Sequence, residues 1–195
     1  MKAYKAVDWN DNATYGQSYK FEPGKTYEEK RSKTAETGFH CASDPFDCLN
    51  YYNWNNENKF YIVEAEGDID EDDRDSRIAC TRITFSEKPM TIKEYLLEEV
   101  AYILKHSKVN LQNVNGNKVR RYVNEKVVSN NLENGVIVVV GKDTLVSTGR
   151  GTIVCFIVRD NRKIRYIGCL KVDGKKYQPQ TFYGYRDTDY KGVEA

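Results

Sequence analysis

The sequence predicts an α+β fold in which a small N-terminal sheet with two helices is followed by a β-rich half. Strand and helix patterns are mixed up to residue 107. One amphipathic segment, 91–106, has the apolar spacing of a helix. Beyond it, short apolar runs recur at close spacing with Asn and Gly at the turns. We expect an N-terminal α+β module over 1–107 and a β-rich module over 108–195 packed on it.

The N-terminal module begins with two short strands. KAYKAVD at the start alternates enough to form the first, and YKFEPGKTYEE forms the second, broken by a turn at Pro23-Gly24. KFYIVEAEG and RIACTRITF have the β-branched and aromatic content of two further strands. The acidic segment between them, IDEDDRDS, reads as an exposed loop.

Two helices are expected in this module. Ser43-Asp44-Pro45 offers an N-cap acceptor and a proline at the first helical position, which predicts a short helix from about 45 to 53. Thr91 and Glu94 form a capping box at the start of the 91–106 helix.

The C-terminal half contains the strand-like segments VNLQNV, NKVRRYVN, KVVS, GVIVVVG, TLVSTG, GTIVCFIVRD, KIRYIGCLKVDG and TFYGYRD. Their regular spacing is compatible with a β-meander or with the stacked rungs of a short β-solenoid. GVIVVVG and TIVCFIV are continuously apolar, so both faces of those strands should be covered.

The bulk composition narrows the class of protein. With 39% hydrophobic and 30% charged residues in 195, the chain is polar but globular. Its five cysteines are odd in number and form no CxxC pair, and the N-terminus lacks the apolar core of a signal peptide, which predicts a cytoplasmic protein. No run of 18 apolar residues predicts a membrane span.

The charges are unevenly distributed although the net charge is only +1. The segment 57–75 is strongly acidic and includes Asp70, Asp72 and Asp73, whereas the chain beyond Lys105 is basic. The acidic segment is either a solvated loop or a mimic of nucleic-acid phosphates. A basic cluster around an expected Asp160-Asn161 hairpin turn is either a phosphate-binding surface or a protected strand edge. Its members are Arg159, Arg162, Lys163 and Arg165, with Lys175, Lys176 and Tyr166 nearby.

The other candidate residues lie in the stretch ETGFHCASDPFDCLNYYN, residues 36–53, and at Trp54 directly after it. His40 and Cys41 are adjacent, so on a strand they face opposite sides and cannot form a nucleophile pair, and no zinc-ligand spacing is present. We therefore expect no metal. Tyr51, Tyr52 and Trp54 form either a stacking platform for a base or an aromatic anchor for the short helix.

Read as a whole, the sequence resembles a family of uncharacterised phage and prophage proteins that carry a domain of unknown function. The matching segments are MKAYKAVD, KFEPGKTYEE, ETGFHCASDPFDCLNYYN, KFYIVEAEG, the 91–106 helix and LKVDGKKYQPQTFYGYRD. The resemblance implies a mobile-element origin and rung-like repeats in the middle of the chain. It carries no catalytic motif.

A local segment is similar to ADP-ribosyltransferases of the poly(ADP-ribose) polymerase type. Gly38-Phe39-His40-Cys41-Ala42 is followed by Asn50-Tyr51 at the spacing of that family. The resemblance implies that Gly38, His40 and Tyr51 bind NAD, with Tyr51 stacked on nicotinamide. It also implies a catalytic glutamate, for which Glu64, Glu66 and Glu133 are candidates. The early His-Gly of that family is absent.

We therefore expect an accessory protein of a phage or mobile element that works in the host cytoplasm without a cofactor. It would bind a host macromolecule, most naturally a protein, and inhibit a defence system. The alternatives are an ADP-ribosyltransferase-like enzyme that binds NAD and a nucleic-acid-binding module that uses the basic hairpin. The candidate contact residues are Arg159, Arg162, Lys163, Arg165, Asp70, Asp72 and Asp73.

Overall fold

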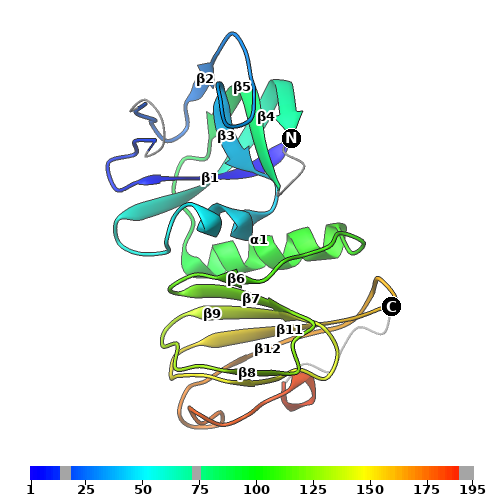
Figure 1. Cartoon of the computed structure of the whole chain (residues 1–195). Helices are drawn as coiled ribbons and strands as arrows, with labels where there is room; N and C mark the ends of the chain where they lie inside the picture. Colours follow the sequence, from blue (N-terminus) through cyan, green and yellow to red (C-terminus); the bar gives the residue numbers. More distant parts are fainter. Residues whose placement is uncertain (14–18, 72–75, 189–195) are drawn as a thin grey trace. The chain divides into compact units, whose positions relative to one another are not determined.

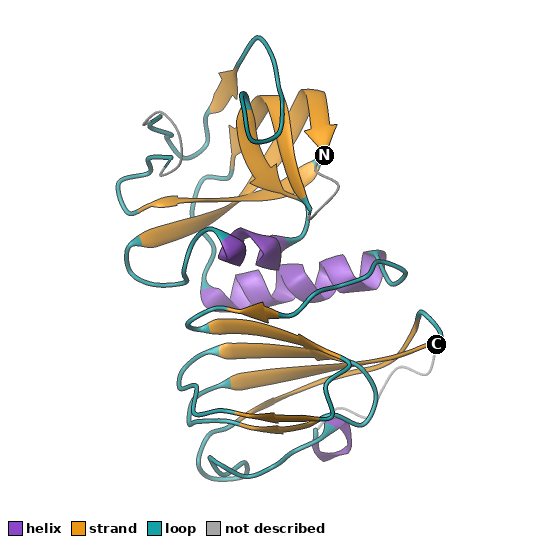
Figure 2. Cartoon of the chain, viewed as in Figure 1, coloured by secondary structure: helices purple, strands orange, loops and turns teal. Residues whose placement is uncertain are grey.

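The computed structural model of the chain describes residues 1–13, 19–71 and 76–188 (Figure 1). It divides into two compact units, Met1–Glu99 and Val100–Ala195. Strands far outnumber helices in the described ranges (Figure 2). This matches the predicted α+β class with a β-rich second half. None of the described helices is both long and apolar enough to cross a membrane.

The first unit is built on an antiparallel sheet that closes on itself. Its strands are β1 (Lys2–Asp8), β2 (Thr26–Glu28), β3 (Phe39–Ala42), β4 (Asn58–Glu71) and β5 (Arg77–Phe85). They lie in the order β2-β5-β3-β1-β4, and β5 also pairs with β4. That extra pairing joins β1, β4, β5 and β3 into a ring, which removes most of the sheet's edges.

Apolar residues at alternate strand positions fill the inside of this ring. Ala3 and Val7 on β1 belong to one core cluster with Phe39, Phe85 and neighbouring aliphatic residues. Phe21 stacks on Phe85 with ring centroids 4.6 Å apart. Because side chains on a strand alternate between its faces, Lys5 lies on the same face as Ala3 and Val7. It is only 8% exposed.

Both predicted helices are present. The first is a 3-10 helix, η1 (Pro45–Asn50), which is shorter than the predicted 45–53. Its N-cap is Asp44, whose carboxylate accepts a hydrogen bond from the Phe46 amide at 2.9 Å.

The longer helix, α1 (Ile92–Lys105), begins in the first unit and ends in the second. Its predicted capping box is confirmed. The Thr91 amide donates to the Glu94 carboxylate at 2.7 Å, and the Glu94 amide donates to the Thr91 hydroxyl at 3.3 Å.

The acidic segment IDEDDRDS, residues 69–76, was predicted as a loop, and this prediction was wrong for its first part. β4 continues through Glu71, and Ile69, Asp70 and Glu71 pair with Cys80, Ala79 and Ile78 of β5. A bulge at Gly67, where φ is 79°, shifts the register and lets the strand continue. Residues 72–75 of the predicted loop lie outside the described residues.

The second unit is a short β-solenoid. Its strands are β6 (Val114–Asn115), β7 (Val119–Val123), β8 (Val127–Ser129), β9 (Val136–Val140), β10 (Leu145–Ser147), β11 (Ile153–Asp160) and β12 (Lys163–Lys171). β7, β9 and β11 pair in parallel, as do β8 and β10 (Figure 1). A meander would pair neighbouring strands antiparallel. The solenoid alternative is therefore the correct one.

Successive rungs of the solenoid are in register. Val119 pairs with Val136 and Val136 pairs with Ile153, so each rung begins 17 residues after the previous one. Inward-facing aliphatic and aromatic residues form one buried cluster that includes Ile137 and Phe156. The hydroxyl of Thr152 closes a corner by donating to the Leu132 carbonyl at 2.6 Å.

The last strands depart from the rung pattern. β12 pairs antiparallel with β11 and is the terminal strand of the five-stranded sheet β12-β11-β9-β7-β6. The segment TFYGYRD was predicted as a strand and is not one. It makes a single bridge from Tyr183 to Val146 and then forms the 3-10 helix η2 (Tyr185–Asp187).

Candidate functional site

The basic cluster predicted from the sequence lies on the β11–β12 hairpin. β11 ends at Asp160 and β12 begins at Lys163, and the two residues between them, Asn161 and Arg162, have φ of 48° and 63°. Two central residues with positive φ define a type I′ turn, whose twist suits a tight hairpin. The turn was predicted at Asp160-Asn161 and therefore lies one residue later.

The cations near this turn project into solvent. Arg162, Lys163, Arg165 and Lys171 are all exposed. The register shifts between Val158 and Arg159, which leaves Arg165 without a directly opposite residue on β11. Such a bulge redirects the side chains of the bulged strand.

None of these four cations is held by a neighbouring acid. No carboxylate among residues 1–13, 19–71 and 76–188 forms an ion pair with them. Along an antiparallel strand that rises about 3.4 Å per residue, Lys163 and Lys171 are separated by roughly 27 Å. The hairpin and the edge strand therefore carry positive charge over an extended surface.

Two of the predicted cluster members have structural roles instead. The Arg159 guanidinium donates to the carbonyls of Ser107 at 3.3 Å and Val109 at 3.0 Å. The Tyr166 hydroxyl is hydrogen-bonded to the Thr188 hydroxyl, and its ring packs on Tyr185 with centroids 5.3 Å apart. These contacts fix the chain segments beside the hairpin, so neither side chain belongs to the free basic surface.

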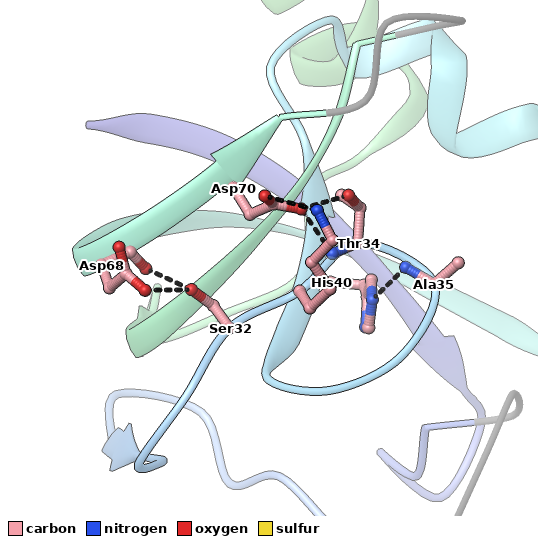
Figure 3. A network of polar contacts seen from close by, with 7 residues as sticks. Ser32, Thr34, Ala35, His40, Asp68 and Asp70 are labelled. Carbon is pink, nitrogen blue, oxygen red and sulfur yellow. Dashed lines mark hydrogen bonds and ion pairs between the residues drawn. The ribbon is translucent and has the colours of Figure 1, made fainter.

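Four acidic residues of β4, Glu64, Glu66, Asp68 and Asp70, make contacts within the first unit. Glu64 pairs with the N-terminal ammonium of Met1 at 2.8 Å. Glu66 lies 3.6 Å from the Arg82 guanidinium. Asp68 accepts from the Ser32 hydroxyl at 3.2 Å (Figure 3). Asp72 and Asp73, the other predicted contact residues, lie outside the described residues.

Asp70 is the most strongly bound of these acids. Its carboxylate accepts from the Thr34 hydroxyl and from the Thr34 amide at 2.7 Å (Figure 3). It also pairs with the Lys33 ammonium at 3.1 Å. Thr34 and then Lys33 stabilise the charged form, which lowers the pKa of Asp70 from 3.8 to about 2. Asp70 thus anchors the loop before β3 to β4.

Replacing Asp70 with asparagine should loosen that loop. We expect the Thr34 amide to exchange its hydrogen roughly five- to tenfold faster, because it loses a charged acceptor. The wild-type contact stabilises the fold above pH 3.8 and is lost as the pH falls through about 2, because the folded-state pKa is the lower one. Hydrogen exchange followed by NMR measures both effects. Glu71→Gln, an exposed neighbour on β4, is the control and should leave Thr34 unchanged.

Gly38 and His40 shape the same loop. Gly38 has φ of 86°, and a Cβ there would approach the Cys80 carbonyl oxygen and the Ser32 Cα at 3.0 Å, so glycine is needed for chain packing. The Ala35 amide donates to Nε2 of His40 at 2.9 Å (Figure 3). Burial, followed by the nearby Lys5 and Arg77, lowers the pKa of His40, which favours its neutral form.

The aromatic residues at and just after the end of η1 have distinct environments. Tyr51, the C-cap residue of η1, is 37% exposed, and the Arg77 guanidinium lies 5.6 Å from its ring centroid. Trp54 stacks on Phe60 at 4.6 Å and packs against Tyr95 at 4.8 Å. Trp54 is thus an anchor within the first unit. The NAD-binding role of Gly38, His40 and Tyr51 stays a prediction.

Sequence reasoning missed Lys5 and a polar hollow on the second unit. The Lys5 ammonium donates to the His40 carbonyl at 2.7 Å and lies 5.2 Å from the Phe21 ring centroid. The hollow, of ≈ 380 Å³, is lined by Glu133, Asn134, Arg150, Gly151, Lys171 and Asp173. Alternation on β1 would have placed Lys5 on the core face, whereas the hollow joins segments distant in the sequence.

The described residues thus define a two-unit protein, a closed antiparallel sheet and a short solenoid, with a free basic surface on its final hairpin. Residues 1–98 match the family model described as a domain of unknown function, DUF7666. The chain belongs to that family. No curated protein and no solved structure matches it.

Proposed function

We propose that this protein acts by binding an acidic partner protein through the β11–β12 hairpin and the edge of β12. The observation that carries the proposal is the contrast between the two charged regions. The described acids Glu64, Glu66, Asp68 and Asp70 all have partners within the chain, whereas the four exposed cations of the hairpin have none among the described residues.

The strand edge favours a protein partner over a nucleic acid. β12 is the terminal strand of its sheet among the described residues, and the edge of a terminal strand presents backbone donors and acceptors to which an extended peptide can add as a further strand. Single-stranded nucleic acids are bound largely by stacking on aromatic rings. Tyr166, the aromatic residue of the hairpin, is instead committed to Thr188 and Tyr185. An acidic, extended protein segment is therefore the partner that suits this surface.

The biological setting of the proposal comes from the sequence resemblance. If the protein belongs to a phage or other mobile element, its partner is a host protein in the cytoplasm, and inhibition of a defence component is the corresponding role. Charged edge strands also prevent unwanted sheet pairing, which requires no partner. A binding measurement distinguishes these two roles.

The test is a charge reversal of the hairpin in the full chain. Arg162→Glu, Lys163→Glu and Arg165→Glu together should weaken binding to strand-forming acidic peptides by about 10- to 100-fold, because three attractive contacts become repulsive. Fluorescence anisotropy against peptides graded in glutamate content measures the affinity. The affinity of the wild type for these peptides should fall as the salt concentration rises.

The matched control moves the same charge change to the first unit. Lys30→Glu, Arg31→Glu and Lys93→Glu alter three exposed cations and should leave peptide affinity unchanged. If both variants lose the same peptide affinity, the loss is caused by the change in net charge and not by the hairpin, which would contradict the proposal. Tight binding of duplex DNA that the hairpin variant alone abolishes, without peptide binding, would favour the nucleic-acid alternative.

A further inference from the structure

Two cysteines face each other across the β11–β12 hairpin. Cys155 and Cys169 are directly opposite residues in the antiparallel pairing of these strands. Cys155 is fully buried and Cys169 is exposed. Side chains of opposite residues lie on the same face of a sheet, so the two sulfur atoms are neighbours.

Strand geometry brings this pair within the range of a disulfide. Opposite residues in antiparallel strands have Cα atoms about 4.5 or 5.5 Å apart, depending on their hydrogen bonding. Disulfides span Cα separations of about 4.4–6.8 Å. Both values fit, so side-chain rotation with little backbone movement is sufficient to join the sulfur atoms.

The first unit holds a second pair of interacting thiols, Cys41 and Cys80, but its strand geometry is different. Cys41 lies opposite Ile78 and Cys80 lies opposite Phe39, so these two thiols are offset by two residues along the strands. Both are buried, at 6% and 0% exposure, which keeps an oxidant away from them. The combination of direct opposition and solvent access belongs to Cys155 and Cys169 among the five cysteines.

The two thiols also differ in reactivity. They are hydrogen-bonded to each other, and this contact lowers the pKa of Cys169 while it raises the pKa of Cys155, which burial raises further. The thiolate is the nucleophilic form of cysteine. Cys169 is therefore the residue that an oxidant meets first, and Cys155 is placed to react with the product.

We propose that Cys155 and Cys169 form a redox-active dithiol that a peroxide or a low-molecular-weight disulfide converts to a cross-strand disulfide. With hydrogen peroxide, the Cys169 thiolate attacks one oxygen and forms a sulfenic acid while the O–O bond breaks and water leaves. The Cys155 sulfur then attacks the Cys169 sulfur, the S–O bond breaks, and a second water leaves. Two thiols lose two hydrogens and the peroxide is reduced to two waters.

A disulfide oxidant gives the same product by exchange. Cys169 first forms a mixed disulfide and releases one thiol, and attack by Cys155 then releases the second. The new bond joins β11 to β12 below the turn that carries Arg162 and Lys163. Oxidation would therefore covalently close the base of the basic hairpin. This chemistry does not depend on whether the hairpin binds a partner.

Oxidation of the full-length, reduced protein tests the proposal in two arms, hydrogen peroxide and glutathione disulfide. We expect each to remove two hydrogens from the intact mass, and non-reducing peptide mapping to find one cross-linked peptide that contains Cys155 and Cys169. Cys155→Ser should instead trap a glutathione adduct on Cys169. Cys48→Ser, at a buried cysteine of the first unit, is the control and should oxidise as the wild type does.

Two results would overturn the proposal. One is a wild-type protein in which Cys169 is glutathionylated or over-oxidised while Cys155 remains open to alkylation after unfolding. The other is a protein whose five thiols all survive both oxidants. Because mapping is done on the wild type, neither result depends on how well a cysteine variant folds.

Discussion

Replacing Tyr95 with alanine is expected to lower the free energy of unfolding of the first unit by about 3–5 kcal/mol. Tyr95 is fully buried where α1 meets the closed sheet. Its ring packs against Phe46 at 5.2 Å, Trp54 at 4.8 Å and Phe60 at 5.1 Å. Truncation removes the shared partner of three rings and leaves a cavity that rigid neighbours cannot fill.

A second substitution separates packing from hydrogen bonding at this site. The Tyr95 hydroxyl donates to the Pro45 carbonyl in η1. Tyr95→Phe keeps the ring but leaves that buried carbonyl without this donor, which should cost about 1–3 kcal/mol. Urea unfolding of both variants, followed by tryptophan fluorescence, measures the two losses. Equal losses in both variants would show that the ring cluster adds little, contrary to this expectation.

Local sequence signals predicted the elements whose boundaries are set locally. α1 has a capping box and an apolar stripe, and its observed range, Ile92–Lys105, lies within the predicted 91–106. β5 coincides with the predicted RIACTRITF because β-branched and aromatic residues favour a strand wherever it pairs. The N-cap Asp44 and its following proline likewise located η1.

Elements set by distant pairing were harder to predict. The acidic composition of the segment that begins at Ile69 suggested a loop, yet β5 supplies a partner strand with which residues 69–71 pair. TFYGYRD has strand-like composition but finds only one bridge, at Tyr183. Composition reports local preference, and tertiary pairing overrides it.

The sequence also contains a repeat that indicates the solenoid. VRRYV at 119, VIVVV at 136 and IVCFI at 153 recur at a spacing of 17 residues, which the parallel pairings then bear out. A fixed period of this kind indicates stacked rungs rather than a meander. The weak similarity of the intervening residues obscured it, since only the inward-facing positions need to stay apolar.

The basic surface of the β11–β12 hairpin was predictable in part, because the turn that exposes it has a local sequence signal. Arg162, Lys163 and Arg165 lie beside a tight turn, which locates them on an exposed hairpin from sequence alone. The role of Arg159 was not predictable, because it donates to the carbonyls of Ser107 and Val109, some 50 residues earlier in the chain. Every residue has a backbone carbonyl, so the sequence does not show which carbonyl will accept a hydrogen bond from Arg159.

The second large effect is expected from substitution of the buried residue Lys5. Replacing it with methionine should raise the free energy of unfolding at neutral pH by about 1–3 kcal/mol, because a buried ammonium with few acceptors is replaced by an apolar side chain of similar length. Burial is the main cause that lowers the pKa of Lys5 from 10.5, while the neighbouring thiols Cys41, Cys48 and Cys80 act in the opposite direction.

The stability that Lys5→Met gains over the wild type should decrease as the pH rises. Below the folded-state pKa of Lys5, the folded and unfolded forms are both charged, and the burial penalty is fully present. As the pH rises from that value toward 10.5, the unfolded chain binds the proton more tightly than the folded one, so wild-type stability rises relative to Lys5→Met. The difference between wild type and variant should therefore shrink with rising pH.

Urea unfolding of wild type and Lys5→Met at a series of pH values up to about 10 measures this difference directly. Lys93→Met, at an exposed lysine on α1, is the control and should show no pH-dependent gap. A stability difference between Lys5→Met and the wild type that does not change with pH would mean that the Lys5 amine is equally protonated in the folded and unfolded states. In that case its hydrogen bond to the His40 carbonyl and its contact with the Phe21 ring compensate fully for the lost hydration. Loss of stability in the variant would assign Lys5 a structural role in holding β1 against β3.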